Sequence, residues 1–124
     1  RAEETRAHIY HHYLQDYQKA IELYQQINKP PGTLWNIQDC YHRWGKLREA
    51  LNVLAEIESS FPPDAPNAAW HTAAYLDQAG NKELAIAAAR KIMKKYPNSG
   101  ASSNAHQLLE KYGIRTGGGV IDED

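Results

Sequence analysis

Apolar side chains recur along this chain at the spacing of an amphipathic helix, in short blocks separated by glycine and proline. In residues 47–59 the apolar positions lie three or four residues apart and share one helix face: Leu47, Ala50, Leu51, Leu54 and Ile57. The same pattern predicts helices over residues 3–14, 17–28, 33–44, 47–59, 67–79, 83–95 and 102–112. Because every predicted element is a helix, the sequence predicts an all-α fold.

Glycine and proline mark the breaks between these helices. Residues 30–32, Pro-Pro-Gly, end the second helix, because proline has no amide donor and disfavours helix in the residue before it. Gly45 and Gly80 are expected in tight turns, where a residue without Cβ lets the backbone reverse. Thr33 is expected to cap the third helix.

Part of the sequence repeats itself with a period of 35 residues. Tryptophan, glycine, alanine and proline each occur in a pair at this distance: Trp35 and Trp70, Gly45 and Gly80, Ala50 and Ala85, Pro62 and Pro97. A fixed period of this length indicates a stack of helix–turn–helix units that bury their apolar faces against their neighbours. Ala50 and Ala85 are expected where the two helices of a unit approach each other closely.

This spacing resembles the tetratricopeptide repeat, a helix–turn–helix unit of about thirty-four residues. The motif's packing positions are filled in the second unit by Ile37, Tyr41, Gly45, Leu47, Ala50, Leu54, Ile57 and Pro62, and in the third by Leu76, Gly80, Ala85, Ile86, Ile92 and Pro97. The resemblance implies a right-handed superhelix of three units, residues 3–30, 33–63 and 67–97, with a capping helix at 101–113.

The first unit departs from the repeat pattern. Gln15 stands where the turn glycine belongs, and Ala20 precedes Ala50 by 30 residues, about one helical turn less than the period. We therefore expect the second helix to end early and the angle between the first two units to be atypical.

Length and charge narrow the classes of protein. A chain of 124 residues fits one domain, which we place at residues 1–113, followed by a flexible, glycine-rich acidic tail at 114–124. The net charge of −1 argues against a nucleic-acid partner, which would call for a basic excess. No apolar run is long enough to cross a bilayer, so direct membrane insertion is not expected. Cys40 is the single cysteine and is expected to pack in the core.

Two joints between helices carry a narrower resemblance. Residues 60–64 and 95–99 are similar to the aromatic–proline joints of bacterial envelope repeat proteins, including the Tol–Pal accessory type. With this resemblance, a periplasmic or envelope-associated localisation is expected as much as a cytoplasmic one. Since the chain begins at Arg1 without methionine, we expect a fragment or a processed form. With the envelope resemblance, this predicts a piece of a larger bacterial protein.

In the family that the spacing resembles, the first helices of successive units line a concave groove. The corresponding residues here are His12, Tyr13, Trp35, Asn36, Asp39, His42, Arg43, Trp70, His71, Asp77 and Gln78. Two tryptophans one repeat apart suit recognition of an extended peptide or a helix, because tryptophan combines a large contact area with one hydrogen-bond donor. The alternative is that both tryptophans pack between neighbouring first helices.

Histidines are the other candidate ligands. His8 and His12 lie four residues apart on one helix face, with His11 beside them. Two histidines at this spacing can supply two ligands to one metal ion. No acidic residue stands at a familiar offset and no His-Glu-x-x-His motif occurs, so we expect a solvated or groove-lining cluster, with no metal and no cofactor. No catalytic triad and no phosphate-binding glycine loop is signalled, so an enzyme is not expected.

The sequence therefore predicts a protein–protein interaction module that binds a peptide or a partner protein in its groove. One alternative is a self-association or scaffold segment that forms a homo-oligomer. The other is a regulatory helical domain of a larger protein.

Overall fold

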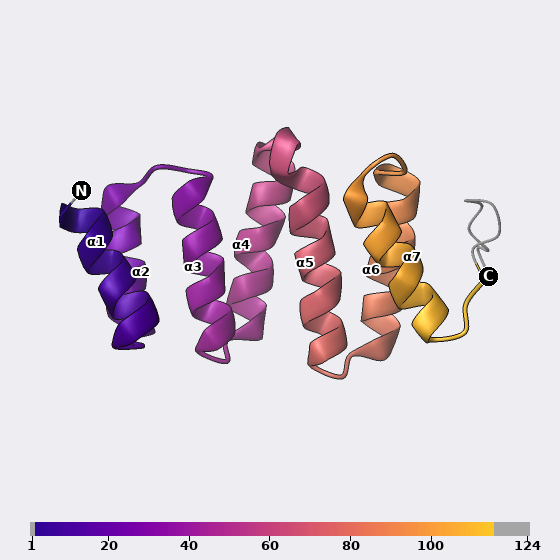
Figure 1. Cartoon of the computed structure of the whole chain (residues 1–124), viewed down its shortest axis with the longest axis horizontal. Coiled ribbons are helices and arrows are strands. Elements are labelled where there is room, and N and C mark those ends of the chain that lie inside the picture. The colour runs from indigo at the N-terminus through magenta and orange to yellow at the C-terminus, as the bar shows by residue number, and fades with distance from the viewer. Residues whose placement is uncertain (1, 116–124) are drawn as a thin grey trace. The chain divides into compact units, whose positions relative to one another are not determined.

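The computed structural model describes residues 2–115, and in that range the chain forms helices and no strand (Figure 1). The elements in chain order are α1 (Ala2–His8), the π-helix η1 (Ile9–Tyr13), α2 (Tyr17–Ile27), α3 (Gly32–Arg43), α4 (Leu47–Ser60), the 3₁₀-helix η2 (Pro62–Asp64), α5 (Ala65–Gln78), α6 (Lys82–Lys95) and α7 (Gly100–Lys111). The predicted all-α fold is confirmed. Residues 116–124, most of the predicted tail, lie outside the described range.

Helices that follow one another in the chain pack together. Helix α1 packs on α2 and α2 on α3, while α5 packs on α6 and α6 on α7. Helix α7 also contacts α5, so it covers both helices of the preceding pair, as expected of a capping helix. This sequential packing is that of a tetratricopeptide-like helical repeat array; the right-handed superhelix stays a prediction.

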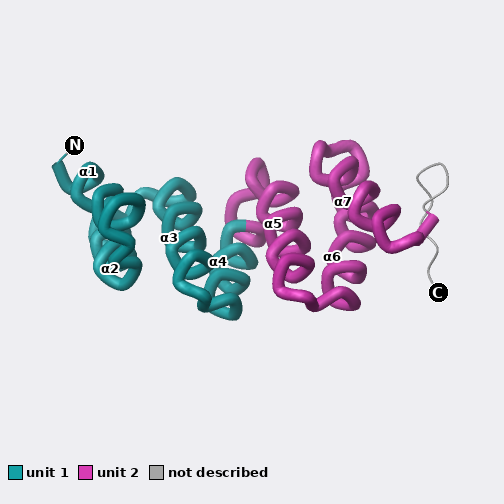
Figure 2. The backbone as a smooth tube through the Cα atoms, turned by 60° about the horizontal axis from the view of Figure 1, so that its bottom comes forward, with its two compact units in different colours: residues 1–57 teal, residues 58–124 magenta. Residues whose placement is uncertain are grey.

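The chain divides into two compact units, residues 1–57 and 58–124, with the division inside α4 (Figure 2). The core of unit 1 centres on Tyr24, which is 2% exposed. Buried around it are Ala7, Ala20, Ile21, Leu23, Ile37 and Cys40. Cys40 has the packing role expected of it, and burial, together with the negative charge of Asp39, raises the pKa of its thiol to about 12.

The core of unit 2 is rich in alanine. Ile92, Met93, Leu108 and Leu109 are packed with five small side chains, Ala69, Ala73, Ala89, Ala101 and Ala105. Alanine lets helix backbones approach closely, and so α5, α6 and α7 form one core with few large side chains. Ile114, at the start of the predicted tail, packs against the edge of this core.

The turns behave as the repeat pattern predicts. Gly45 and Gly80 have φ of +82° and +85°, a left-handed conformation that glycine adopts without a Cβ penalty. Gln15, at the corresponding place in the first unit, has φ of +55°. The first turn therefore keeps the left-handed conformation although the glycine is absent, which strains a residue with a side chain.

The helix bounds decide three of the predictions. Helix α2 has 11 residues against 14 in α4 and α6, which confirms that it ends early. Helix α3 begins at Gly32, so the prediction that Thr33 is its N-cap is wrong; the Thr33 hydroxyl accepts a hydrogen bond from the Lys29 amide instead. Helix α5 begins at Ala65 rather than residue 67, because Pro66 falls in the first turn, where its missing amide removes no helical hydrogen bond.

Candidate functional site

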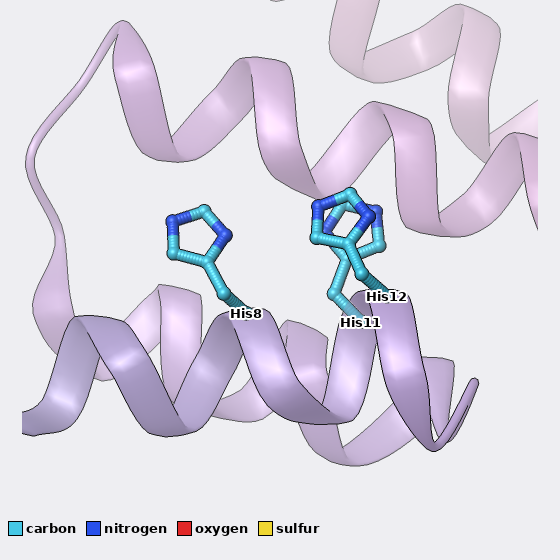
Figure 3. A group of neighbouring side chains, drawn as sticks. All are labelled: His8, His11 and His12. Carbon is cyan, nitrogen blue, oxygen red and sulfur yellow. The ribbon is translucent and has the colours of Figure 1, made fainter.

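The first predicted helix widens into a π-helix at Ile9–Tyr13, which places the histidines of unit 1. The Leu14 amide donates to the Ile9 carbonyl at 2.9 Å, a bond that spans five residues instead of four. His11 points into unit 1 and is 1% exposed, whereas His8 and His12 are exposed. Figure 3 shows the His8 ring beside the overlapping rings of His11 and His12, all on the same side of the helix.

Buried His11 is tied to α3 through Asp39. The His11 Nε2 and Asp39 Oδ2 atoms are 2.7 Å apart, and the Arg43 Nε donates to the same oxygen at 2.7 Å. Burial is the largest influence on both groups. It lowers the pKa of His11, and it would raise the pKa of Asp39, but hydrogen bonds from His11 and Arg43 outweigh it and leave that pKa below its ordinary value. The favoured arrangement is a neutral imidazole beside a carboxylate.

The Tyr24 hydroxyl on α2 lies between two histidines of this group. It is 3.0 Å from His11 Nδ1 and 3.0 Å from His8 Nδ1, and burial raises the pKa of Tyr24 so that it stays a phenol. A carboxylate only accepts, so His11 donates from Nε2 to Asp39 and accepts from Tyr24 at Nδ1. The Tyr24 oxygen then accepts from His8 Nδ1, which leaves Nε2 as the ring nitrogen of His8 that faces away from Tyr24.

The residues predicted to line the groove in unit 1 have unequal surroundings. Asp39 and Arg43 belong to the hydrogen-bonded group just described. The His12 ring stacks on the His11 ring with centroids 3.8 Å apart, and Tyr13 is 81% exposed. The three remaining residues are half-buried on α3: Trp35, Asn36 and His42.

In unit 2, Trp70 packs on the core and Asp77 accepts side-chain hydrogen bonds. Trp70 is half-buried and packs against the alanine-rich core. Asp77 on α5 accepts hydrogen bonds from Lys111 Nζ at 2.5 Å and from the Tyr112 hydroxyl. These bonds, first that from Lys111, hold the pKa of Asp77 below its ordinary value. Asp77 therefore fastens α7 to α5, whatever else it contacts.

The other two predicted residues of unit 2 face outward to different degrees. His71 is half-buried and its Nδ1 lies 2.9 Å from the Asn67 carbonyl oxygen, to which it donates. Gln78, at the end of α5, is exposed. Part of the predicted surface is thus solvent-facing in each unit.

Two pockets lie elsewhere in the units. One of about 260 Å³ in unit 2 is lined by Glu58, Ala69, Thr72, Ala87, Ala88, Lys91, Ile92 and Tyr96, with the Tyr96 hydroxyl donating to Glu58 at 2.7 Å. One of about 300 Å³ in unit 1 is lined by Glu3, Glu4, Leu23, Gln26, Ile27 and Lys29. Neither is lined by a residue predicted for the groove.

Sequence reasoning missed the inward position of His11 and the part played by Tyr24. Both follow from contacts between residues far apart in the chain: His11 and Asp39 are 28 positions apart, and His11 and Tyr24 are 13 apart. The single signal available was the density of histidine at positions 8, 11 and 12.

Comparison with known proteins agrees with the repeat architecture. Residues 68–99 match the family model described as tetratricopeptide repeat, a span that holds most of α5 and all of α6. The match supports the tetratricopeptide repeat family, whose members generally mediate protein–protein interaction. No curated protein and no solved structure matches the chain. The narrower resemblance to the Tol–Pal accessory type therefore gains no support.

Within residues 2–115 each helix is too short or too polar to cross a bilayer.

Proposed function

We propose that this chain is a non-catalytic interaction module that binds a peptide or a partner protein through the first helices of its repeats. The observation that carries the proposal is the match to the tetratricopeptide repeat at residues 68–99, within an array of sequentially packed helices. Since neighbouring repeats in such arrays present equivalent helix faces, the binding residues belong to η1, α3 and α5.

Unit 1 offers the features of a binding surface at these positions. Tyr13 exposes 81% of its surface, and an aromatic ring of this size is a frequent anchor at interfaces. Arg43 is 53% exposed at its side chain, yet its guanidinium is held by Asp39. A cation that is already oriented loses less side-chain entropy when a partner binds. Trp35 and Asn36, half-buried on α3, add one aromatic and one amide.

Unit 2 contributes residues of the same kind on α5. Half-buried Trp70 and His71 lie one helical step apart, and Gln78 is exposed at the end of the helix. Because Trp70 also packs on the core, its removal would confuse binding with folding. Exposed positions are therefore the better test of the proposal.

The test is selection of peptides from a displayed library of random linear sequences, followed by affinity measurements with variants. Tyr13→Ala should weaken the best selected peptide by roughly tenfold or more, the size of an interface hot spot. Leu84→Ala is the matched control, because Leu84 is an exposed apolar residue, 59% exposed, on the second helix α6. Equal binding of the selected peptide by both variants and by Gln78→Ala would contradict the proposal.

Self-association is a second candidate, favoured by exposed apolar side chains at the end of the first helix. Ile9, Tyr13 and Leu14 are 40%, 81% and 60% exposed, and apolar surface of this kind often marks an interface. Sedimentation velocity separates the candidates. A monomer that binds the selected peptide supports the first, and an oligomer that dissociates on Leu14→Ser supports the second.

The partner expected for this module is a protein or a peptide. The balanced charge supports protein rather than nucleic acid as the ligand. The envelope setting and the bacterial origin remain expectations from the sequence alone.

A further inference from the structure

We propose that His8, His11 and His12 form a binding site for a late first-row divalent cation such as Zn²⁺, with imidazole nitrogens as the ligands. The three residues offer ring nitrogens that all lie within 4.8 Å of one another. Imidazole suits zinc, copper and nickel, and three histidines with an open fourth position are a known arrangement for zinc. His12 is also one of the predicted groove residues, but zinc binding needs no partner, so it can be tested apart from the proposed function.

The helix geometry brings the three rings together. His8 and His12 are four residues apart and their rings are nearly parallel, 17° apart in plane, with centroids 5.7 Å apart. In an α-helix the neighbours His11 and His12 would point about 100° apart, whereas here their rings stack at 3.8 Å. Both residues lie in the π-helix Ile9–Tyr13, and their side-chain conformations bring the two rings together beside His8 (Figure 3). Such π-helical turns are frequent at functional sites.

The distances allow a cation with side-chain movement alone. Zinc–nitrogen bonds of about 2.0–2.1 Å place the ligand nitrogens of a tetrahedral site roughly 3.3 Å apart. Nitrogens within 4.8 Å reach that spacing by rotation of exposed side chains. His8 and His12 are both exposed, so these two ligands are the mobile ones and a cation has access from solvent.

Asp39 is the acidic partner of a histidine ligand that the spacing of residues 8–12 did not show. Metal-bound histidine commonly donates its second ring N–H to a carboxylate, which fixes the tautomer and the ring orientation. The His11 Nε2 is 2.7 Å from Asp39 Oδ2, and Arg43 holds that carboxylate in place. The His11 Nδ1 lone pair thus already points away from Asp39, as a ligand to the cation must.

Tyr24 competes with the cation for this lone pair. Its hydroxyl lies 3.0 Å from the Nδ1 atoms of both His8 and His11, in the space between the two rings. A cation that takes His11 Nδ1 must displace the bond from Tyr24. Tyr24→Phe should therefore bind Zn²⁺ more tightly than the wild type, because it frees the His11 Nδ1 lone pair, although it removes a polar group.

The experiment is a Zn²⁺ titration of the full chain, prepared without a polyhistidine tag, in competition with a chromophoric zinc indicator. We expect one Zn²⁺ per chain, no competition from Mg²⁺, which prefers oxygen ligands, and a higher melting temperature with Zn²⁺. The His8→Gln, His12→Gln double variant should lose the site, and Asp39→Asn should weaken it about 10–100-fold. His71→Gln is the matched control in unit 2 and should bind as the wild type does.

Folding and binding are kept apart by the choice of residues. His8 and His12 are exposed, so their double variant should stay folded in chelator, with the far-ultraviolet dichroism of the wild type. Buried His11 is tested through Tyr24→Phe and through its NMR signals, which substoichiometric Cu²⁺ should broaden before those of His42, His71 and His106. Equal Zn²⁺ affinity of wild type and double variant would overturn the proposal, as would weaker binding by folded Tyr24→Phe or simultaneous broadening of all six histidines.

Discussion

Replacement of Leu109 by alanine should remove a large share of the stability of unit 2. Leu109 on α7 is fully buried, and several of its neighbours in the core are alanines on α5, α6 and α7. Leucine-to-alanine changes in cores cost about 2–5 kcal/mol, and more where the surroundings cannot collapse into the cavity. Helices already spaced by alanine have little further to move, so we expect about 3–5 kcal/mol.

That cost is large for a unit of this size. At roughly 0.05–0.15 kcal/mol per residue, residues 58–124 have a free energy of unfolding of about 3–10 kcal/mol. The substitution should therefore bring the unit close to half-unfolded or shift its urea midpoint strongly. Unfolding of residues 58–124 should also release α7, because the buried side chains of α7 belong to the same core as those of α5 and α6.

The assay is urea denaturation followed by far-ultraviolet dichroism and by fluorescence. Trp35→Phe and Trp44→Phe in the background leave Trp70, which packs on the core of unit 2, as the reporter. Leu84→Ala, the same chemical change at a residue 59% exposed, is the control and should cost less than about 0.5 kcal/mol. If Leu109→Ala lies within that margin of the control, α7 is not part of the core and the capping role assigned to it is wrong.

Three further outcomes follow from the packing, the turns and the charges. Ala85→Leu, at a fully buried site, should lower stability by about 1–3 kcal/mol in thermal melts, whereas Ala87→Leu on the exposed face of α6 should not. Gly80→Ala should destabilise by about 1 kcal/mol and Gln15→Gly should stabilise, because both positions have positive φ; melting temperatures that move in the same direction would contradict this. Because the folded-state pKa of Asp77 is depressed, its stabilising effect is complete above the ordinary value of 3.8 and is lost as the pH falls through the depressed pKa. The melting temperatures of wild type and Asp77→Asn should differ at neutral pH and converge in strong acid, and a constant difference would exclude this origin.

Much of the fold could be predicted because the repeat depends on the conformation and size of single residues. Gly45 and Gly80 mark turns by the conformations that only glycine adopts easily, and Ala50 and Ala85 mark positions of complete burial. The short α2 followed from the reduced distance between Ala20 and Ala50. These features are single residues at fixed distances along the chain, which a sequence displays directly.

The arrangement around His11 could not be predicted for the same reason. Apolar spacing does not separate a π-helical turn from an α-helical one over five residues, so the inward position of His11 had no signature. Its partners Tyr24 and Asp39 come from two other helices, and only the packed unit 1 brings them within 3.0 Å. The residues of the predicted groove stay a prediction, supported by family pattern and by exposure in each unit.

The burial of Cys40 makes its thiol a natural probe for the opening of unit 1. A thiol that is fully buried, with its pKa raised to about 12, reacts with a disulfide reagent almost solely after the surrounding helices separate. At limiting reagent concentration the labelling rate then reports the equilibrium between closed and open forms, and at excess reagent it reports the opening rate itself. The opening of unit 1 can thus be measured in the natural sequence without an engineered probe. The same labelling rate, measured with a bound ligand, would show how strongly that ligand suppresses the opening.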